Sequence, residues 1–246
     1  MADRKGTILA GGEGKRLLPL TYVTNKSLLP VFDKPMITYP LDTLKRSGVD
    51  NVCIVTGEDH LEDFIRFLEI YVRPTLTFTY RVQSKPHGTA HALLQSEGFF
   101  GEDKVVVVLA DNVFGDATVP DSAFTDKYAY IFVKENSNPS LFGVVEIDSE
   151  GNAISIEEKP ESPKSNLVLT GMYVYPNDVF RRIRQLKESL RGELELTDII
   201  KEYMQEGLLK VVRVDGFWSD VGSFDSLLKA SEYYSKLGKD VTGGKH

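Results

Sequence analysis

The sequence has few of the features that mark secreted, membrane-spanning or nucleic-acid-binding proteins. Its single cysteine, Cys53, excludes an internal disulfide. No apolar run approaches the length of a membrane span, and residues 1–5 (MADRK) lack the composition of a signal peptide. Lys and Arg number 29 against 36 Asp and Glu, and the resulting net charge of −7 argues against a basic nucleic-acid-binding face. We therefore expect a cytoplasmic protein whose partners include neither a membrane nor a nucleic acid.

The rest of the composition is that of an ordinary globular protein, with 41% hydrophobic and 26% charged residues in a chain of 246. Strands are predicted at residues 7–10, 51–56, 76–82 and 104–109, alternating with helices at 36–47, 60–68 and 89–97. Further strands are predicted at 128–134, 142–147, 153–158 and 167–175, then helices at 177–186 and 197–206, a strand at 209–214 and a helix at 223–237. The pattern predicts an α/β fold, with a Rossmann-like, mixed and mostly parallel central sheet and helices on both faces.

The first predicted strand runs directly into a glycine-rich loop, LAGGEGKR at residues 9–16. Its three glycines let backbone N–H groups approach an anion without Cβ clashes. Lys15 and Arg16 follow at once, and Lys26 comes ten residues later. An arginine adds a planar fork to a phosphate and a lysine adds a mobile point charge. The loop therefore predicts a binding site for a polyphosphate.

Two better-known glycine loops do not fit these residues. A dinucleotide-binding loop needs G-x-G-x-x-G, and Leu17 stands where its third glycine belongs. A P-loop needs G-x-x-x-x-G-K-[ST], and here Leu9 replaces the first glycine and Arg16 the hydroxyl residue. The loop is therefore neither of these motifs.

Together with the motifs that follow it, the loop resembles the sugar-1-phosphate nucleotidyltransferases. The matching runs are GGEGKRLLPLT from residue 11, NKSLLPV from 25, KPMI from 34, EEKP from 157, RGELE from 191 and WSD from 218. The similarity extends from Lys5 to about Leu237 and is greatest to members that join dTTP to α-D-glucose 1-phosphate. It implies the nucleotide-diphospho-sugar transferase fold in one domain over residues 1–238. We expect a nucleotide-binding half at about 1–115, a sugar-binding half at about 128–238 and a tail at 239–246.

The resemblance also implies roles for individual residues. We expect the catalytic groups to be Arg16, Lys26, Asp111 and Lys159. The nucleotide is expected to contact Leu9, Gly11, Gly12, Gly14, Lys15, Arg16, Lys26, Gln83, Pro86, Gly88 and Asp111. The sugar phosphate is expected to contact Phe142, Gly143, Glu158, Lys159, Thr170, Gly171 and Trp218.

Two aspartates are candidates for a metal site. Asp111 follows the apolar run at 105–110 and would emerge at the carboxyl edge of the sheet, where ligands collect in such folds. Asp220 follows Trp218 in the second half of the chain. Two carboxylates that converge on triphosphate oxygens suit Mg²⁺, which takes few protein ligands. The resemblance implies that Asp111 and Asp220 hold Mg²⁺.

Substrate identity is left open by the motif GTAHA at residues 88–92. This run also resembles the G-T-A-x-A of uridylyl- and hexosamine-phosphate-using enzymes, so UTP or a hexosamine 1-phosphate is the alternative. Within that run, His91 is predicted to be a helix residue rather than a base. A non-catalytic nucleotide-sugar-binding paralogue is a further alternative, although it would be expected to lose Arg16, Lys26, Asp111 or Asp220.

Two expectations concern assembly and regulation. The resemblance implies a homo-oligomer. Longer relatives continue for about forty residues in a helical extension that contributes to a separate regulatory site. Without such an extension we expect feedback inhibition by a nucleotide sugar at that site to be weak or absent.

Overall fold

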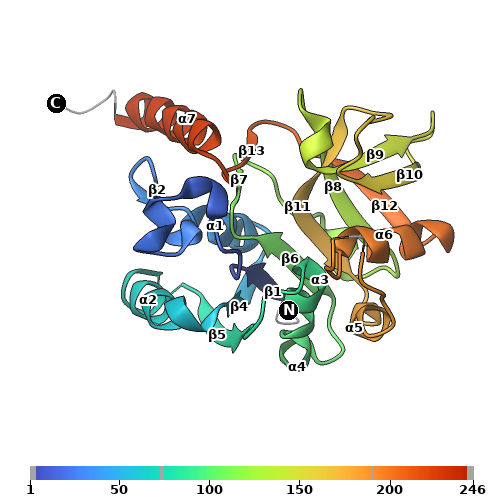
Figure 1. Cartoon of the computed structure of the whole chain (residues 1–246), viewed down its shortest axis with the longest axis horizontal. Helices are drawn as coiled ribbons and strands as arrows, with labels where there is room; N and C mark the ends of the chain where they lie inside the picture. Colours follow the sequence, from blue (N-terminus) through green and yellow to red (C-terminus); the bar gives the residue numbers. More distant parts are fainter. Residues whose placement is uncertain (1–3, 73–74, 190, 243–246) are drawn as a thin grey trace.

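The structure, a computed structural model, describes residues 4–72, 75–189 and 191–242. Within these ranges a nine-stranded sheet runs through the molecule in the order β10-β9-β11-β6-β1-β4-β5, and β8 links β11 to β12 beside this path (Figure 1). Its strands are β1 (Arg4–Leu9), β4 (Val49–Thr56), β5 (Thr77–Val82), β6 (Val105–Leu109), β8 (Ala129–Glu135), β9 (Gly143–Ile147), β10 (Ala153–Glu158), β11 (Leu167–Tyr175) and β12 (Leu209–Arg213).

The first half of the chain supplies the parallel part of the sheet. β1 lies between β4 and β6 and runs parallel to both, with Ile8 beside Ile54 and Val108, and β5 continues parallel on β4. β6 begins with four fully buried valines, as expected for a strand covered on both faces. β11 then runs antiparallel to β6, β8 and β9. The predicted mixed sheet is confirmed.

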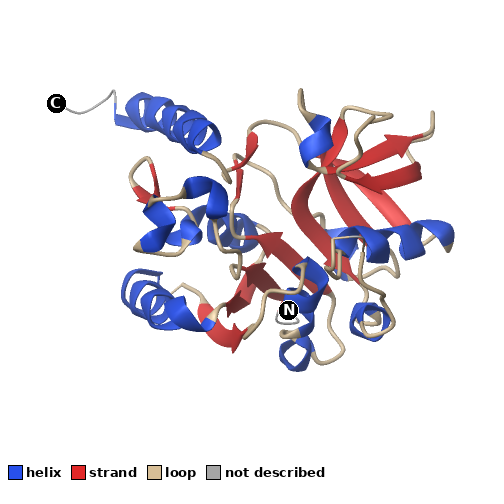
Figure 2. Ribbon diagram, viewed as in Figure 1, coloured by secondary structure: helices blue, strands red, loops and turns tan. Residues whose placement is uncertain are grey.

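Helices cover both faces of the sheet (Figure 2). Because alternate side chains of a strand point to opposite faces, Val105 and Val107 pack in one core cluster with α3, α4, α5 and α6, whereas Val106 and Val108 pack in another with α1 and α2. These helices are α1 (Thr38–Arg46), α2 (Leu61–Phe67), α3 (Thr89–Leu94), α4 (Glu97–Phe100), α5 (Val179–Ile183) and α6 (Leu196–Gln205). The predicted helical layers are therefore present on both sides.

A small second sheet, not predicted from the sequence, joins the two halves of the chain. β7 (Asn112–Phe114) pairs antiparallel with β13 (Trp218–Asp220), so that Asn112 faces Asp220. The backbone N–H of Val221 also donates to the Asp111 carbonyl at 2.7 Å. This pairing carries the two predicted metal ligands to one place.

Three predicted helices differ clearly from the observed ones. The helix predicted over 177–186 is limited to α5 (Val179–Ile183). The helix predicted over 89–97 is divided into α3 and α4, where the hydroxyl of Ser96 donates to the Leu93 carbonyl at 2.7 Å and competes with helical backbone bonding. The last helix, α7 (Phe224–Thr242), runs beyond its predicted end at residue 237 and into the segment expected to be a tail. Residues 243–246 of that expected tail lie outside the described part of the chain.

A third core cluster lies beside the segment that follows the glycine loop. A short hairpin of β2 (Pro30–Val31) and β3 (Lys34–Pro35) follows the loop. Val31 packs in this cluster with Val113 and with Ala230 of α7. The hairpin, β7 and the last helix are thereby joined.

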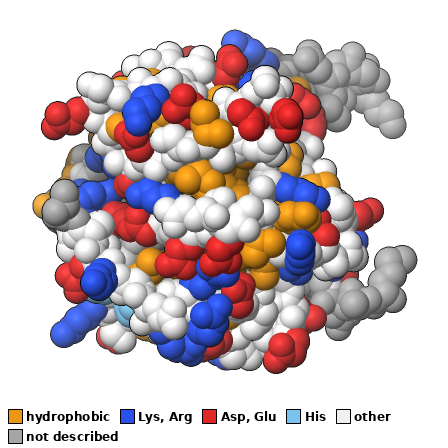
Figure 3. Space-filling model, turned by 90° about the vertical axis from the view of Figure 1, so that its right-hand side faces the viewer, with side chains coloured by type: hydrophobic (Ala, Val, Ile, Leu, Met, Phe, Trp, Pro, Cys, Tyr) orange, Lys and Arg blue, Asp and Glu red, His pale blue; other side chains and the backbone are white. Residues whose placement is uncertain are grey.

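The surface of the second half is of mixed character. Figure 3 shows acidic and basic side chains interspersed over the side that carries β9, β10 and α6, with apolar side chains between them. In the described ranges, no helix combines the length and the apolar character needed to cross a membrane.

Candidate active site

A cavity of about 440 Å³ opens over the carboxyl ends of the parallel strands and contains most of the predicted nucleotide-binding residues. It is lined by Leu9, Gly11, Gly12, Glu13, Lys15, Lys26, Gln83, Pro86, Gly88, Thr89, Ala92, Leu109, Asp111 and Glu193. Of the residues predicted to contact the nucleotide, Gly14 and Arg16 do not line it. The residues predicted from local motifs thus line one cavity, although they come from segments that are far apart in the sequence.

The glycine loop owes its shape to close packing against the segment that follows it. Gly14 has a φ of +66° at the start of a 3₁₀ turn, Lys15–Leu17, and its carbonyl accepts a hydrogen bond from the Thr21 hydroxyl at 3.0 Å. A Cβ at Gly14 would lie 2.7 Å from the Thr21 side chain, and one at Gly12 would lie 3.0 Å from the Lys26 Nζ. Larger residues would therefore push the loop away from Lys26.

The cations of the loop point in different directions. The Lys15 ammonium is largely exposed and pairs with Glu13 at 2.6 Å. The Arg16 guanidinium reaches across to Asp220, with 4.0 Å between Nη2 and Oδ1. A Cβ on Gly222 would collide with this guanidinium, so Gly222 leaves the space that Arg16 occupies. Arg16 thus lies beside the predicted metal site rather than in the wall of the nucleotide cavity.

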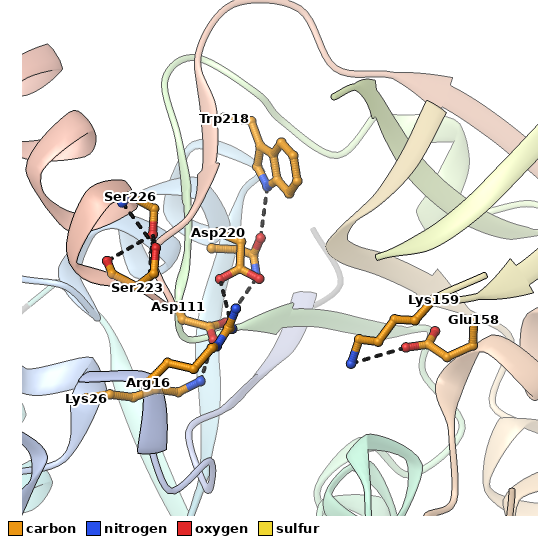
Figure 4. Close-up of polar contacts among 10 residues, drawn as sticks. Arg16, Lys26, Asp111, Glu158, Lys159, Trp218, Asp220, Ser223 and Ser226 are labelled. Carbon is orange, nitrogen blue, oxygen red and sulfur yellow. Dashed lines mark hydrogen bonds and ion pairs between the residues drawn. The ribbon is translucent and has the colours of Figure 1, made fainter. Parts of the chain in front are cut away.

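Asp111 and Asp220 form a charged cluster with Lys26 and Arg16 (Figure 4). The Lys26 ammonium donates to Oδ2 of Asp111, and the side-chain amide of Asn112 donates to Oδ1 at 3.0 Å. Oδ1 of Asp220 is buried and has no hydrogen-bond partner among the described residues. The Asp111 carboxylate is therefore paired with an adjacent cation, whereas one oxygen of the Asp220 carboxylate has no hydrogen bond among the described residues.

The two carboxylates also differ in their pKa values. Burial opposes ionisation of Asp111, but the adjacent Lys26 ammonium outweighs it and holds the pKa of Asp111 below its usual range. Burial, together with the negative charge of Asp111, raises the pKa of Asp220 to about 6. Asp220 would therefore gain from a further cation.

This arrangement fits Mg²⁺. Mg²⁺ binds oxygen ligands, commonly through one or two carboxylates, and completes its octahedron with waters and substrate phosphates. Asp111 and Asp220 supply two such carboxylates, and one of the buried oxygens has no hydrogen bond. Among the described residues there is no cluster of three or more His, Cys, Asp or Glu side chains suited to a metal ion, so the remaining ligands would come from substrate and water.

A second cavity, of about 160 Å³, adjoins the first and contains most of the predicted sugar-phosphate site. Its predicted lining residues are Phe142, Gly143, Glu158, Lys159 and Gly171. Thr170 and Trp218 lie behind the wall instead. The Thr170 hydroxyl donates to the Phe132 carbonyl, and the Trp218 indole N–H donates to Asn112 Oδ1 at 2.9 Å and to the Thr170 carbonyl at 3.0 Å.

Cations and carboxylates alternate around the second cavity. Lys159 has a φ of +44°, and its ammonium lies 3.6 Å from Glu158 Oε1 (Figure 4). Arg191, from the loop before α6, lies 3.6 Å from the same oxygen and 3.3 Å from Glu195. The Thr197 hydroxyl donates to the other Glu158 oxygen. Burial and the neighbouring Glu158 raise the pKa of Glu195.

Arg191, Glu195 and Thr197 are site residues that the sequence interpretation did not assign. They lie in the run RGELELT, which carried part of the family resemblance but was given no chemical role. Their position became clear only from the fold, because α6 packs against β10 and so places the loop before it opposite Glu158 and Lys159.

Comparison with known proteins extends over both cavities. The sequence pattern described as nucleotidyl transferase matches residues 5–236. The chain is 41% identical over 235 residues to the glucose-1-phosphate thymidylyltransferase of Neisseria meningitidis serogroup A, covering 93% of this chain and 82% of that protein. It is also 41% identical over 238 residues to the protein of the same name from Mycobacterium tuberculosis, covering 95% and 83%.

Solved structures show the same likeness. A Bacillus anthracis protein, described as a glucose-1-phosphate thymidylyltransferase and crystallised with sucrose, has a TM-score of 0.86 and 42% identity, covering 93% of this chain and 94% of that one. A UDP-glucose pyrophosphorylase bound to UDP-glucose has a TM-score of 0.82 and 26% identity, covering 96% and 99%. The similarity therefore includes the whole of the cavity region.

Proposed function

The chain belongs to the nucleotidyl transferase family, and on this premise we propose that it forms dTDP-glucose and pyrophosphate from dTTP and α-D-glucose 1-phosphate. The observation that carries the proposal is the junction of the two cavities. Asp111 lines the nucleotide cavity, Asp220 lines the sugar cavity, and both cavities share Thr89, Leu109 and Glu193. A triphosphate in one cavity and a sugar phosphate in the other would meet at this carboxylate pair.

The reacting groups belong to the substrates. An oxygen of the sugar phosphate attacks the α-phosphorus of dTTP and forms a new P–O bond. The bond from the α-phosphorus to the pyrophosphate oxygen breaks. Pyrophosphate takes the electron pair of that bond and leaves opposite the attacking oxygen. Such a reaction needs positioned reactants and neutralised charge rather than a protein nucleophile. Bound at Asp111 and Asp220, Mg²⁺ would supply part of that neutralisation.

The cations are placed to serve different phosphates. Lys26 lies at the junction, in contact with Asp111, and would bind the α-phosphate. Arg16 lies beside Asp220 and would bind the departing β,γ-phosphates together with the amides of the glycine loop. Lys159 and Arg191 face each other across Glu158 in the sugar cavity and would hold the sugar phosphate.

Base and sugar recognition follow from the walls of the two cavities. Gln83, almost fully buried, lies between Gly11 and Gly88 and would present its side-chain amide to a pyrimidine. Gly88 has a φ of +93°, and a Cβ there would collide with the Leu194 backbone. Glu158, fixed by Thr197, would accept hydrogen bonds from the sugar hydroxyls.

The second candidate is a UTP-using enzyme of the same family. It is favoured by the GTAHA run and by the fold likeness to a UDP-glucose pyrophosphorylase. A panel of dTTP, UTP, dCTP and ATP against glucose 1-phosphate and two hexosamine 1-phosphates, scored by pyrophosphate release, separates the candidates. The highest kcat/KM with dTTP and glucose 1-phosphate supports the proposal, whereas a higher value with UTP overturns it. A paralogue without turnover would release no pyrophosphate with any pair.

We also propose a homo-oligomer in the cytoplasm. Apolar side chains of Tyr22, Val23 and Leu228 are 79%, 84% and 61% exposed, and burial against a second copy would cover such surface. Cys53 is a buried free thiol, in keeping with a reducing compartment. Light scattering after size-exclusion chromatography measures the mass of the assembly, and the mass of a monomer would contradict the proposed homo-oligomer.

A further inference from the structure

His91 and Gln83 form a hydrogen-bonded pair at the base end of the nucleotide cavity. The Gln83 amide nitrogen lies 2.8 Å from Nδ1 of His91. Gln83 follows the end of β5 and His91 lies in the first half of α3, so the pair also joins two elements. We propose that His91 is a positioning residue that fixes the Gln83 amide and thereby makes the site select thymine or uracil over cytosine. This inference rests on the proposed function.

Two contacts determine which way the Gln83 amide points. Its nitrogen faces the carbonyl oxygen of Gly88 at 3.5 Å, and a carbonyl oxygen accepts hydrogen bonds but cannot donate them. The same nitrogen faces Nδ1 of His91. The amide oxygen points the other way, lying 3.0 Å from where a Cβ of Gly11 would be. A rotation of the amide by 180° would set its oxygen against the Gly88 carbonyl.

The position of the proton on the His91 ring decides whether Nδ1 can accept a hydrogen bond. To accept from the Gln83 amide, Nδ1 must be unprotonated, which places the ring proton on Nε2. Burial and the neighbouring His87 both lower the pKa of His91, in keeping with a neutral ring. The Gln95 amide nitrogen lies 3.4 Å from Nε2, but it is already bonded to the His91 carbonyl at 3.1 Å. The short contact to Gln83 is therefore the one that decides the tautomer.

A fixed amide reads the base through its hydrogen-bond order. Thymine and uracil carry a donor at N3 and an acceptor at O4, whereas cytosine carries an acceptor at N3 and a donor at N4. Because Gly88 and His91 take up both N–H groups of the Gln83 amide, the amide presents only its oxygen to the base. That oxygen accepts from the N3–H of thymine or uracil but faces a lone pair at N3 of cytosine. To bind cytosine in the position that suits thymine, Gln83 would have to rotate and place its oxygen against the lone pair of His91 Nδ1. The pair therefore excludes cytosine and leaves thymine and uracil equally matched at this edge.

The test compares three variants in their use of dTTP and dCTP with the same sugar phosphate. His91→Leu removes the acceptor. His91→Asn retains one, because the asparagine Oδ1 can occupy about the position of Nδ1. Gln95→Leu is the matched control, since it removes another neighbour of the same ring from the same helix. If His91→Leu does not fold, His91→Ala removes the same acceptor with less added volume.

We expect His91→Leu to lower the dTTP-to-dCTP ratio of kcat/KM by at least about tenfold, since exchanging one buried hydrogen bond for two facing lone pairs commonly costs that much. The change should appear as a higher KM for dTTP and a lower KM for dCTP. His91→Asn and Gln95→Leu should keep the ratio within about threefold of the original. A loss of kcat with both nucleotides and an unchanged ratio would show a merely structural role and overturn the proposal.

Binding measured without turnover separates this inference from the proposed function. Calorimetric titration with dTTP and dCTP in the absence of sugar phosphate gives the same selectivity ratio even if no product forms. Selective dTTP binding that His91→Leu abolishes supports the inference whether or not the reaction is the one proposed. Equal binding of dTTP and dCTP by the unaltered protein overturns the inference, even where pyrophosphate release supports the proposed function.

Discussion

Replacing Asp220 by asparagine should make the metal-free protein more stable while making the enzyme nearly inactive. The side chain is largely buried beside the negative Asp111, and one of its oxygens has no hydrogen-bond partner among the described residues. These surroundings raise its pKa from an ordinary 3.8 to about 6. The raised pKa means that ionising Asp220 costs folding free energy, and asparagine removes that cost without changing the shape of the side chain.

The magnitude follows from the size of the shift. A rise from 3.8 to about 6 corresponds to about 3 kcal/mol, which is an upper value because the side chain keeps some contact with water. Because the folded-state pKa is the higher one, the cost is absent below pH 3.8, grows between pH 3.8 and 6, and is constant above pH 6. The gain from Asp220→Asn should therefore be full at pH 8 and much smaller at pH 4.5.

Asp111→Asn is the matched comparison. The Lys26 ammonium holds the pKa of Asp111 below its usual range, so this carboxylate stabilises the fold when ionised. Its replacement leaves the buried ammonium of Lys26 unpaired and should destabilise the protein by about 3 kcal/mol. Both variants should lose at least about 10²-fold in kcat, because each removes a carboxylate of the proposed metal site.

Urea unfolding at pH 8 in EDTA, with and without added Mg²⁺, measures these effects together with pyrophosphate release. Asp220→Asn should have the higher unfolding free energy in EDTA and should lose the additional stability that Mg²⁺ gives the unaltered protein. A metal-free Asp220→Asn protein less stable than the original by more than about 1 kcal/mol would refute the reasoning, because it would give this carboxylate a stabilising partner.

Three further predictions test the rest of the site. Lys159→Ala should raise KM mainly for the sugar phosphate, and Arg16→Ala should affect mainly turnover and KM for dTTP. Steady-state kinetics with each substrate varied in turn measures both effects. An effect of Lys159→Ala on the KM for dTTP alone would contradict the assignment of Lys159 to the sugar-phosphate cavity. Mg²⁺ affinity without nucleotide, followed by calorimetry, should fall about tenfold from pH 8 to pH 5, because a proton on Asp220, with its pKa of about 6, competes with the metal. Trp218→Phe should lower the unfolding free energy by about 1–3 kcal/mol, as Asn112 Oδ1 and the Thr170 carbonyl lose their shared donor; no change in urea unfolding would argue against that role.

Much of the nucleotide site could be predicted because its residues lie in short continuous motifs. The glycine loop, Gln83 and Asp111 each follow a strand of the parallel half, and the ends of parallel strands meet at one edge of a sheet. Strand periodicity and turn residues were therefore enough to bring these residues together, and the mixed sheet with helices on both faces followed from the same pattern.

The remainder depended on contacts between distant segments. Asp220 lies beside Asp111 because β13 pairs with β7, two three-residue strands too short to give a periodic signal. From the sequence, the Trp218 side chain could line the sugar site or pack in the core. Only the hydrogen bonds of its indole show that it lies behind the cavity wall. Arg191 and Glu195 were visible in the sequence, but their role depends on how α6 packs.

The most direct test of the account is to follow the oxygens of the attacking phosphate. Glucose 1-phosphate with ¹⁸O in the non-bridging phosphate positions is incubated with unlabelled dTTP, Mg²⁺ and the protein, and both products are analysed by mass spectrometry. Attack of the sugar phosphate on the α-phosphorus predicts dTDP-glucose that carries all of the label, together with unlabelled pyrophosphate. Label in the pyrophosphate, or no dTDP-glucose at all, would contradict the account.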